Sequence, residues 1–146
     1  MLENKVSHCD PHQRIIISRD GSVCTHRAEN YDECAVRQYF IDGEVINDDR
    51  IEKCDKLVLN DDRKTAYYIE LKGSDIRKAI RQVENTERLL KSELMGYTSL
   101  YRIIYRTGTH DVNSSNTIRW KERCGKDAET GKAVAIVSNR KYAEKI

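Results

Sequence analysis

The chain has 146 residues, the size of one ordinary domain, and 34% of them are charged while 38% are hydrophobic. Its formal net charge is only +2, so any affinity for nucleic acid must come from a local patch rather than from the molecule as a whole. No apolar run is long enough to cross a membrane, and the first residues lack the apolar stretch of a signal peptide. These features predict a cytoplasmic protein.

The first part of the chain is predicted to be mainly β-structure. Residues 14–18 and 22–26 are β-rich runs on either side of the turn signal Arg19-Asp20-Gly21, which indicates a hairpin. Residues 27–35 carry a weak helical pattern, and residues 36–41 are again β-rich.

The middle of the chain predicts two strands and the longest helix. Residues 54–59 and 65–72 are β-rich and are separated by a polar turn, which predicts an antiparallel pair. Apolar residues then recur at helical spacing over residues 75–94, and Ser74 is placed to cap the start of this helix.

The last part predicts a strand at residues 100–105, a short helix within 113–125 and a buried, all-apolar strand at 133–137. The whole order predicts an α/β fold with a mixed central β-sheet flanked by helices. With one Pro and seven Gly, no linker is visible. We therefore expect a single domain over residues 1–146, with an N-terminal extension or hairpin at 1–35 and a core at 36–138.

One group of charged residues carries the strongest chemical signal. Glu70 and Lys72 are two positions apart on a strand and so share one face, and Asp55 on the preceding strand could approach Glu70. Two converging carboxylates repel each other unless a divalent cation such as Mg²⁺ or Mn²⁺ lies between them. Such a site suits phosphodiester hydrolysis, with Lys72 orienting the attacking water. The alternative is a Glu70–Lys72 ion pair on a solvated strand.

Asp55, the run Glu70-Leu71-Lys72 and a following helix that contains Gln82 resemble the PD-(D/E)XK nuclease superfamily, whose fold is restriction-endonuclease-like. The resemblance covers residues 36–138 and is nearest to small bacterial and phage members. It implies that Asp55, Glu70 and the Leu71 carbonyl bind the metal ion and that Lys72 is catalytic. Cys54 stands where the name-giving Pro would be.

Many members of this superfamily carry a further acidic residue on a first helix, for which Glu29 and Glu33 are the candidates here. Gln82 could bind a substrate phosphate or a water near the site, or it could be an ordinary surface residue. Arg77, Lys78 and Arg81 could contact phosphates, or they could form a solvated helix face.

We therefore expect a metal-dependent nuclease that acts on DNA rather than RNA, as a homodimer or within a larger complex. A catalytically inactive module of the same fold, which binds nucleic acid, a nucleotide or a protein, is the alternative. A third interpretation is a small zinc-stabilised protein. Its candidate ligands are His8, Cys9, Cys24, His26 and Cys34.

Overall fold

The computed structural model describes residues 1–21, 23–107 and 111–146, with the side chain of Lys72 outside this description. The elements in chain order are β1 (Ile15–Asp20), β2 (Cys24–Glu29), β3 (Val36–Phe40), β4 (Lys56–Asn60), β5 (Thr65–Gly73), α1 (Ile76–Leu90), β6 (Thr98–Tyr105), α2 (Ser115–Cys124), β7 (Ala135–Asn139) and β8 (Lys141–Lys145).

The strands form two sheets. The larger sheet has the order β3-β4-β5-β6-β7, in which β3, β4 and β5 make an antiparallel meander and β6 and β7 continue parallel to β5. The smaller sheet has the order β1-β2-β8, with β1 antiparallel and β8 parallel to β2. The predicted α/β class and mixed central sheet are confirmed.

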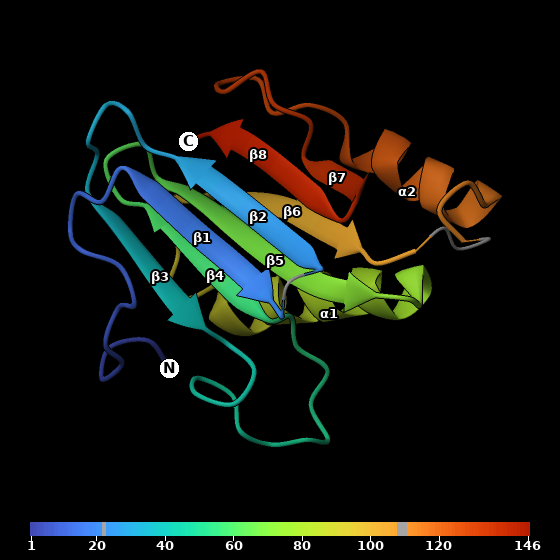
Figure 1. Cartoon of the computed structure of the whole chain (residues 1–146), viewed down its shortest axis with the longest axis horizontal. Helices are drawn as coiled ribbons and strands as arrows, with labels where there is room; N and C mark the ends of the chain where they lie inside the picture. The colour runs from blue at the N-terminus through green and yellow to red at the C-terminus, as the bar shows by residue number, and fades with distance from the viewer. Residues whose placement is uncertain (22, 108–110) are drawn as a thin grey trace.

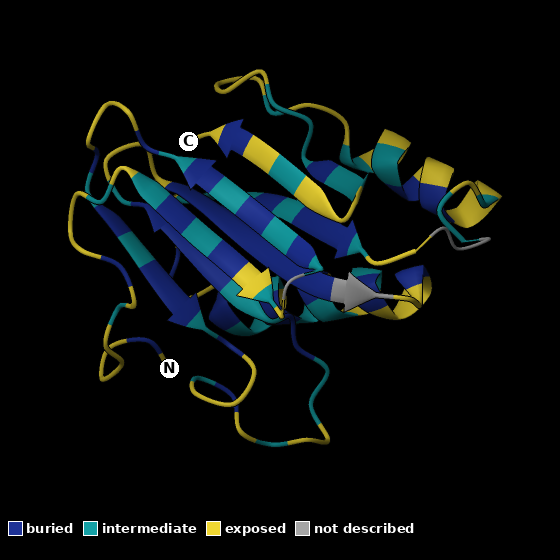
Figure 2. Ribbon diagram, in the orientation of Figure 1, coloured by how far each residue is buried: buried dark blue, intermediate teal, exposed yellow. Residues whose placement is uncertain are grey.

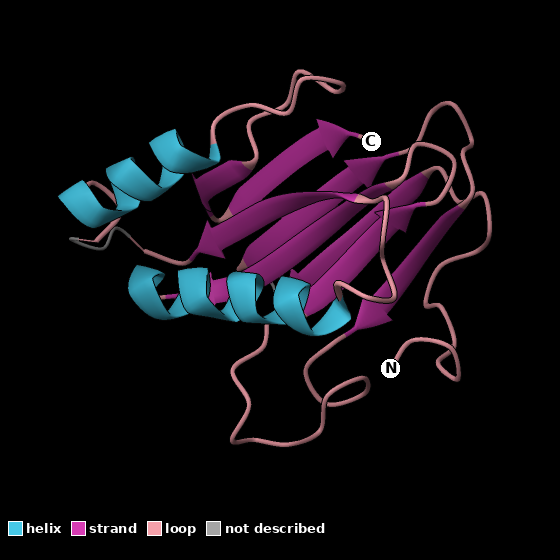
Figure 3. Cartoon of the chain, turned by 180° about the vertical axis from the view of Figure 1, so that it is seen from behind, coloured by secondary structure: helices cyan, strands magenta, loops and turns pink. Residues whose placement is uncertain are grey.

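The two sheets and the helices form three layers (Figures 1 and 3). Helix α1 and Trp120 of α2 share one hydrophobic cluster with one face of the larger sheet. The other face of that sheet packs against the smaller sheet in a second cluster that includes Ile16, Ala28 and Ile69. The expectation of a sheet flanked by helices is therefore wrong on one side, where the N-terminal hairpin and β8 take the place of a helix.

Helix α1 is held by a regular apolar stripe, since Ile76, Ala79, Val83 and Leu90 are buried. Its N-cap is Asp75 rather than the predicted Ser74, because the Asp75 carboxylate accepts a 3.0 Å hydrogen bond from the Lys78 N–H. The helix ends at Leu90, four residues earlier than predicted.

Two other predictions differ from the structure, and one strand was not predicted. Strand β2 continues to Glu29, so residues 27–35 do not begin a helix. Strand β7 is only partly buried, because it is an edge strand with a single neighbour, β6. The alternating, polar sequence of β8 gave no strand prediction, although this strand completes the smaller sheet. No helix among the described residues is long and apolar enough to span a membrane.

Candidate functional site

Asp55 and Glu70 lie across from each other on the same face of the larger sheet. Lys56 pairs with Ile69 in the β4–β5 register, which sets the preceding Asp55 opposite Glu70. The Asp55 N–H donates to the Ile69 carbonyl at 3.1 Å, and the Leu71 N–H donates to Asp55 Oδ2 at 2.7 Å. Backbone hydrogen bonds on both sides of Asp55 thus fix its carboxylate beside β5.

The two carboxyl groups are buried and affect each other electrostatically. Glu70 is only 8% exposed, and its Oε1 has no hydrogen-bond partner among the described residues. Burial, together with the negative charge of Asp55, raises the pKa of Glu70 to about 9. Burial also raises the pKa of Asp55, against the opposing effect of the hydrogen bond from Leu71. A pair with these properties resists carrying two negative charges unless a cation joins it.

Helix α1 positions the backbone that leads into Asp55. The Cys54 N–H donates to Thr86 Oγ1 at 2.9 Å, and the same hydroxyl donates to the Gln82 carbonyl at 2.8 Å. Thr86 is fully buried, so this link between helix and strand is shielded from water. Sequence reasoning missed Thr86, because a single polar residue within an apolar stripe has no signature of its own.

Two further acidic residues act on the pair, and neither was predicted. The negative charge of Asp42 adds to the raised pKa values of both Asp55 and Glu70, and the charge of Asp20 adds to that of Asp55. Lys53 lies near Asp42, with its Nζ 3.7 Å from Asp42 Oδ1, and is itself buried. Asp42 and Asp20 lie at turn signals, where an acidic residue has an ordinary structural explanation.

The candidates for a further acidic ligand, Glu29 and Glu33, are not placed to join the pair. Glu29 lies at the end of β2 in the smaller sheet, where it forms a 3.1 Å ion pair with Arg27 and accepts a hydrogen bond from the Tyr31 hydroxyl. Glu33 is exposed in a turn with a positive φ of 52°. The predicted helix that would have carried such a residue is absent, because the hairpin occupies that face of the larger sheet.

The other predicted site residues fall into two groups. Leu71 and Lys72 belong to β5, next to Glu70, but the Lys72 side chain lies outside the described part of the structure. Gln82 is half-buried on α1, and no side-chain hydrogen bond of Gln82 occurs among the described residues. Its predicted part in the site stays a prediction.

The three basic residues predicted to contact phosphates are exposed on α1. Arg81 pairs with Glu52 through a 3.1 Å contact, whereas Arg77 and Lys78 have no ion pair within the described residues. The structure therefore leaves both interpretations of this helix face open.

The Asp55–Glu70 pair suits a divalent cation that retains several waters. Its oxygens are hard ligands, and the buried Oε1 of Glu70 has no hydrogen-bond partner within the described part of the chain. Among residues 1–21, 23–107 and 111–146, no group of three or more His, Cys, Asp or Glu side chains is placed to hold a metal ion. Water and substrate oxygens would have to complete the coordination.

The candidate zinc ligands do not form a common site in the described part of the chain, because the His residues have other partners and the Cys residues are buried thiols. His8 stacks on Phe40 and contacts Glu44 at 2.8 Å, while His26 contacts Glu144 at 2.7 Å. Cys9, Cys24 and Cys34 are buried free thiols. The described residues thus give this interpretation no support.

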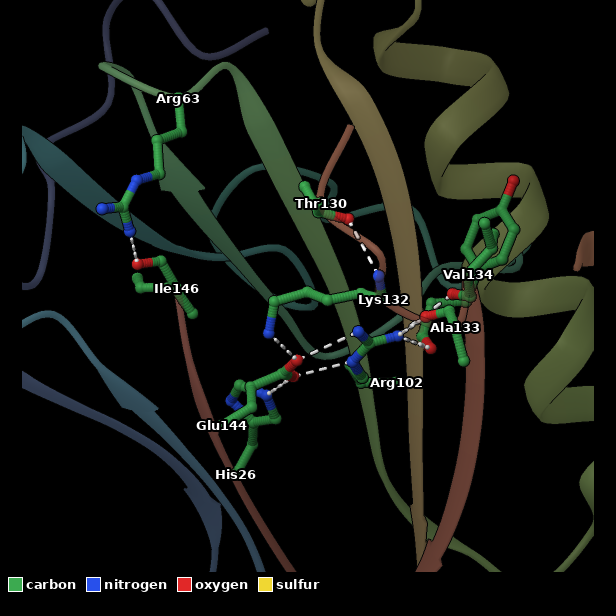
Figure 4. A network of polar contacts seen from close by, with 10 residues as sticks. His26, Arg63, Arg102, Thr130, Lys132, Ala133, Val134, Glu144 and Ile146 are labelled. Carbon is green, nitrogen blue, oxygen red and sulfur yellow. Dashed lines mark hydrogen bonds and ion pairs between the residues drawn. The ribbon is translucent and has the colours of Figure 1, made fainter. Parts of the chain in front are cut away.

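A second buried polar cluster joins the two sheets (Figure 4). Glu144 of β8 is at its centre and contacts His26 of β2 at 2.7 Å, Arg102 of β6 at 2.7 Å and Lys132 at 3.0 Å. The Arg102 guanidinium also donates to the carbonyls of Ala133 and Val134, each at 3.1 Å. Although burial by itself raises the pKa of Glu144, the hydrogen bonds from His26 and Arg102 hold that pKa well below its usual range.

This cluster has the properties of a structural tie. Arg102 and Glu144 form a bidentate ion pair, and nearly all of the remaining donors of the Arg102 guanidinium have acceptors. A buried ion pair is stable when its remaining polar groups are satisfied in this way. The Asp55–Glu70 pair differs, because two buried carboxyl groups face each other and no cation pairs with them among the described side chains, which do not include that of Lys72. Of the two clusters, the acidic pair is the one whose arrangement calls for a ligand.

Comparison with protein-family models, with curated proteins and with solved structures finds no match to this chain.

Proposed function

We propose that this protein hydrolyses phosphodiester bonds in DNA, with Asp55 and Glu70 as ligands of a divalent cation. The observation that carries the proposal is the buried Oε1 of Glu70, which has no hydrogen-bond partner among the described residues, beside the fixed carboxylate of Asp55. The element order supports it as well. A β-meander delivers the two acids, and a helix, a strand, a helix and a strand follow, as in the nuclease superfamily that the sequence resembles.

The proton on Glu70 and the hydrogen bond to Asp55 would govern how the site takes up a cation. In the metal-free protein Glu70 holds a proton at neutral pH, because its pKa is about 9. Binding of Mg²⁺ must displace this proton, so the metal affinity is expected to rise with pH. The Leu71 N–H keeps Asp55 Oδ2 oriented throughout. When bound, the cation would supply charge neutralisation at the scissile phosphate and a more acidic water.

Lys72 follows Glu70 by two positions on β5, and its side chain lies outside the described part of the structure. Its proposed role is to orient the attacking water and to stabilise the charge that develops on phosphorus. The buried Thr86, which bonds the Cys54 N–H, would serve as a positioning residue for Asp55.

Cleavage of a panel of single- and double-stranded DNA and RNA, with Mg²⁺ or Mn²⁺, tests the proposal. Wild type is compared with Glu70→Gln, Asp55→Asn and Lys72→Ala, and with Glu122→Gln as a matched control on the exposed surface of α2. Metal-dependent cutting that the three site substitutions abolish and the control retains supports the nuclease. No cutting of any substrate, or cutting that survives all three, overturns it in favour of a module that only binds.

A further inference from the structure

The outward face of the smaller sheet is a continuous, uncovered surface. Burial alternates along its strands, and the inward residues pack on the larger sheet, while no element in the described part of the chain covers the other side (Figures 1 and 2). We name this surface the basic sheet face. Its residues are Ile15, Ile17, Arg19, Thr25, Arg27, Glu29, Lys141, Ala143 and Lys145.

Positive charge dominates the basic sheet face, which carries four cationic side chains and one carboxylate. The carboxylate, Glu29, is already paired with Arg27 at 3.1 Å. Arg19 and Lys141 are exposed, and neither forms an ion pair within the described ranges. This concentration stands out because the formal net charge of the whole chain is only +2.

The register arranges these cations around a groove. Arg19 pairs with Thr25, and Thr25 pairs with Lys141, so one row across the sheet has a cationic residue at each end, and the backbones of these two residues are about 10 Å apart. The next row is formed by Ile17, Arg27 and Ala143. A groove of about 440 Å³ lies over these two rows, and no carboxylate lines it. Such a surface is complementary to a chain of phosphates.

The composition of this face also indicates which nucleic acid it suits. Proteins that bind single strands stack bases on aromatic side chains, and none of the nine outward residues is aromatic. Tyr142 also lines the groove, but it is half-buried, and its ring centroid lies 6.3 Å from that of His26. Contacts from Arg and Lys to phosphates need no stacking and position a duplex without reading its sequence. Backbone contacts to double-stranded DNA therefore fit this face better than a single-stranded ligand does.

The groove lies at the end of the smaller sheet where β1 ends, whereas Asp55 and Glu70 share the helix-side face of the larger sheet with Leu57 and Tyr68. Asp20 ends β1 directly after Arg19, and its charge contributes to the raised pKa of Asp55. We infer that the basic sheet face binds the phosphate backbone of double-stranded DNA, through Arg19, Arg27 and Lys141. The choice of DNA as the polyanion rests on the proposed function.

Binding is measured without metal, in EDTA, by fluorescence anisotropy of a labelled duplex at several salt concentrations. The double variant Arg19→Ser/Lys141→Ser is compared with Arg119→Ser/Arg123→Ser, which removes the same charge from an exposed part of α2. The sheet variant is expected to bind ~10-fold more weakly and to lower the salt slope by about two, because two phosphate contacts are lost. The helix variant is expected to bind like wild type.

A loss of binding in the helix variant alone, or tighter binding of single-stranded DNA or RNA of the same sequence, would overturn the inference. Equal melting temperatures of both variants show that the change concerns the surface and not the fold. The binding inference and the proposed nuclease function can also fail independently of each other. A chain that binds through Arg19 and Lys141 but cuts nothing retains this inference and loses the proposed function. Cutting that is unchanged by substitution of Arg19 and Lys141 retains the proposed function and overturns this inference.

Discussion

Replacing Glu70 by Gln should make the metal-free protein more stable, and increasingly so as the pH rises. The raised pKa means that the folded state holds the Glu70 proton more tightly than the unfolded state does. Below an ordinary value of 4.5 both states are protonated, and the group contributes nothing. Between that value and about 9 the unfolded state ionises while the folded state does not, so rising pH favours unfolding. Gln cannot ionise and lacks this effect.

The magnitude follows from the size of the shift. Each pH unit inside this window lowers the free energy of unfolding of wild type by about 1.4 kcal/mol. At pH 7 the accumulated effect is about 3 kcal/mol relative to acid conditions, and between pH 5 and pH 8 it amounts to about 4 kcal/mol. A buried Gln amide adds its own cost, which does not change with pH. The pH dependence of the stability difference between wild type and Glu70→Gln is therefore a better measure than that difference at one pH.

Urea unfolding of wild type and Glu70→Gln at pH 5, 6.5 and 8, in EDTA, measures this change. Glu122→Gln on the exposed side of α2 is the control, and its difference from wild type should stay constant with pH. A difference between wild type and Glu70→Gln that is also constant with pH would refute the reasoning. Glu70 would then titrate normally, and its burial beside Asp55 would no longer argue for a cation site.

Three other predictions concern the metal, the second polar cluster and the helix contact. Saturating Mg²⁺ should raise the melting temperature of wild type but not of Glu70→Gln, because only the former retains both ligands; differential scanning calorimetry measures it. Glu144→Gln should cost about 3–5 kcal/mol at pH 7, since Arg102 stays buried without its anion. That loss should shrink as the pH falls below about 4.5, because the depressed pKa of Glu144 stabilises the fold only while the group is ionised. Thr86→Val should cost about 1–3 kcal/mol and speed hydrogen exchange at the Cys54 amide, whereas Thr86→Ser should keep both near wild type.

Local patterns in the sequence predicted most of the fold. The hairpin of β1 and β2, the β4–β5 pair, the amphipathic α1 and the short α2 each have a signal within a few neighbouring residues. Strand β8 has no such signal, because its place depends on pairing with a strand far away in the sequence. For the same reason, the identity of the layer that covers the second face of the larger sheet could not be predicted.

The central acids of the candidate site were also predictable. Glu70 and Asp55 were found because strand alternation and a tight turn constrain where two neighbouring strands direct their side chains. Thr86, Asp42 and Asp20 were not found, since each acts through a contact or a field that exists only in the folded chain. A polar residue in a helix and acids in turns look the same in a sequence whether or not they meet such a site.

The pairing of β2 with β8 has a consequence for how the chain folds. His26 and Glu144 meet although they are 118 positions apart in the sequence. The hairpin and the meander can form from local contacts while the chain is still being synthesised, but the small sheet must wait for β8. Until then the edge of β2 is open to pairing with other chains, and Arg102 has no counter-charge. A deletion of β8 or a bulky tag at this strand would therefore promote aggregation during synthesis without acting through the acidic pair.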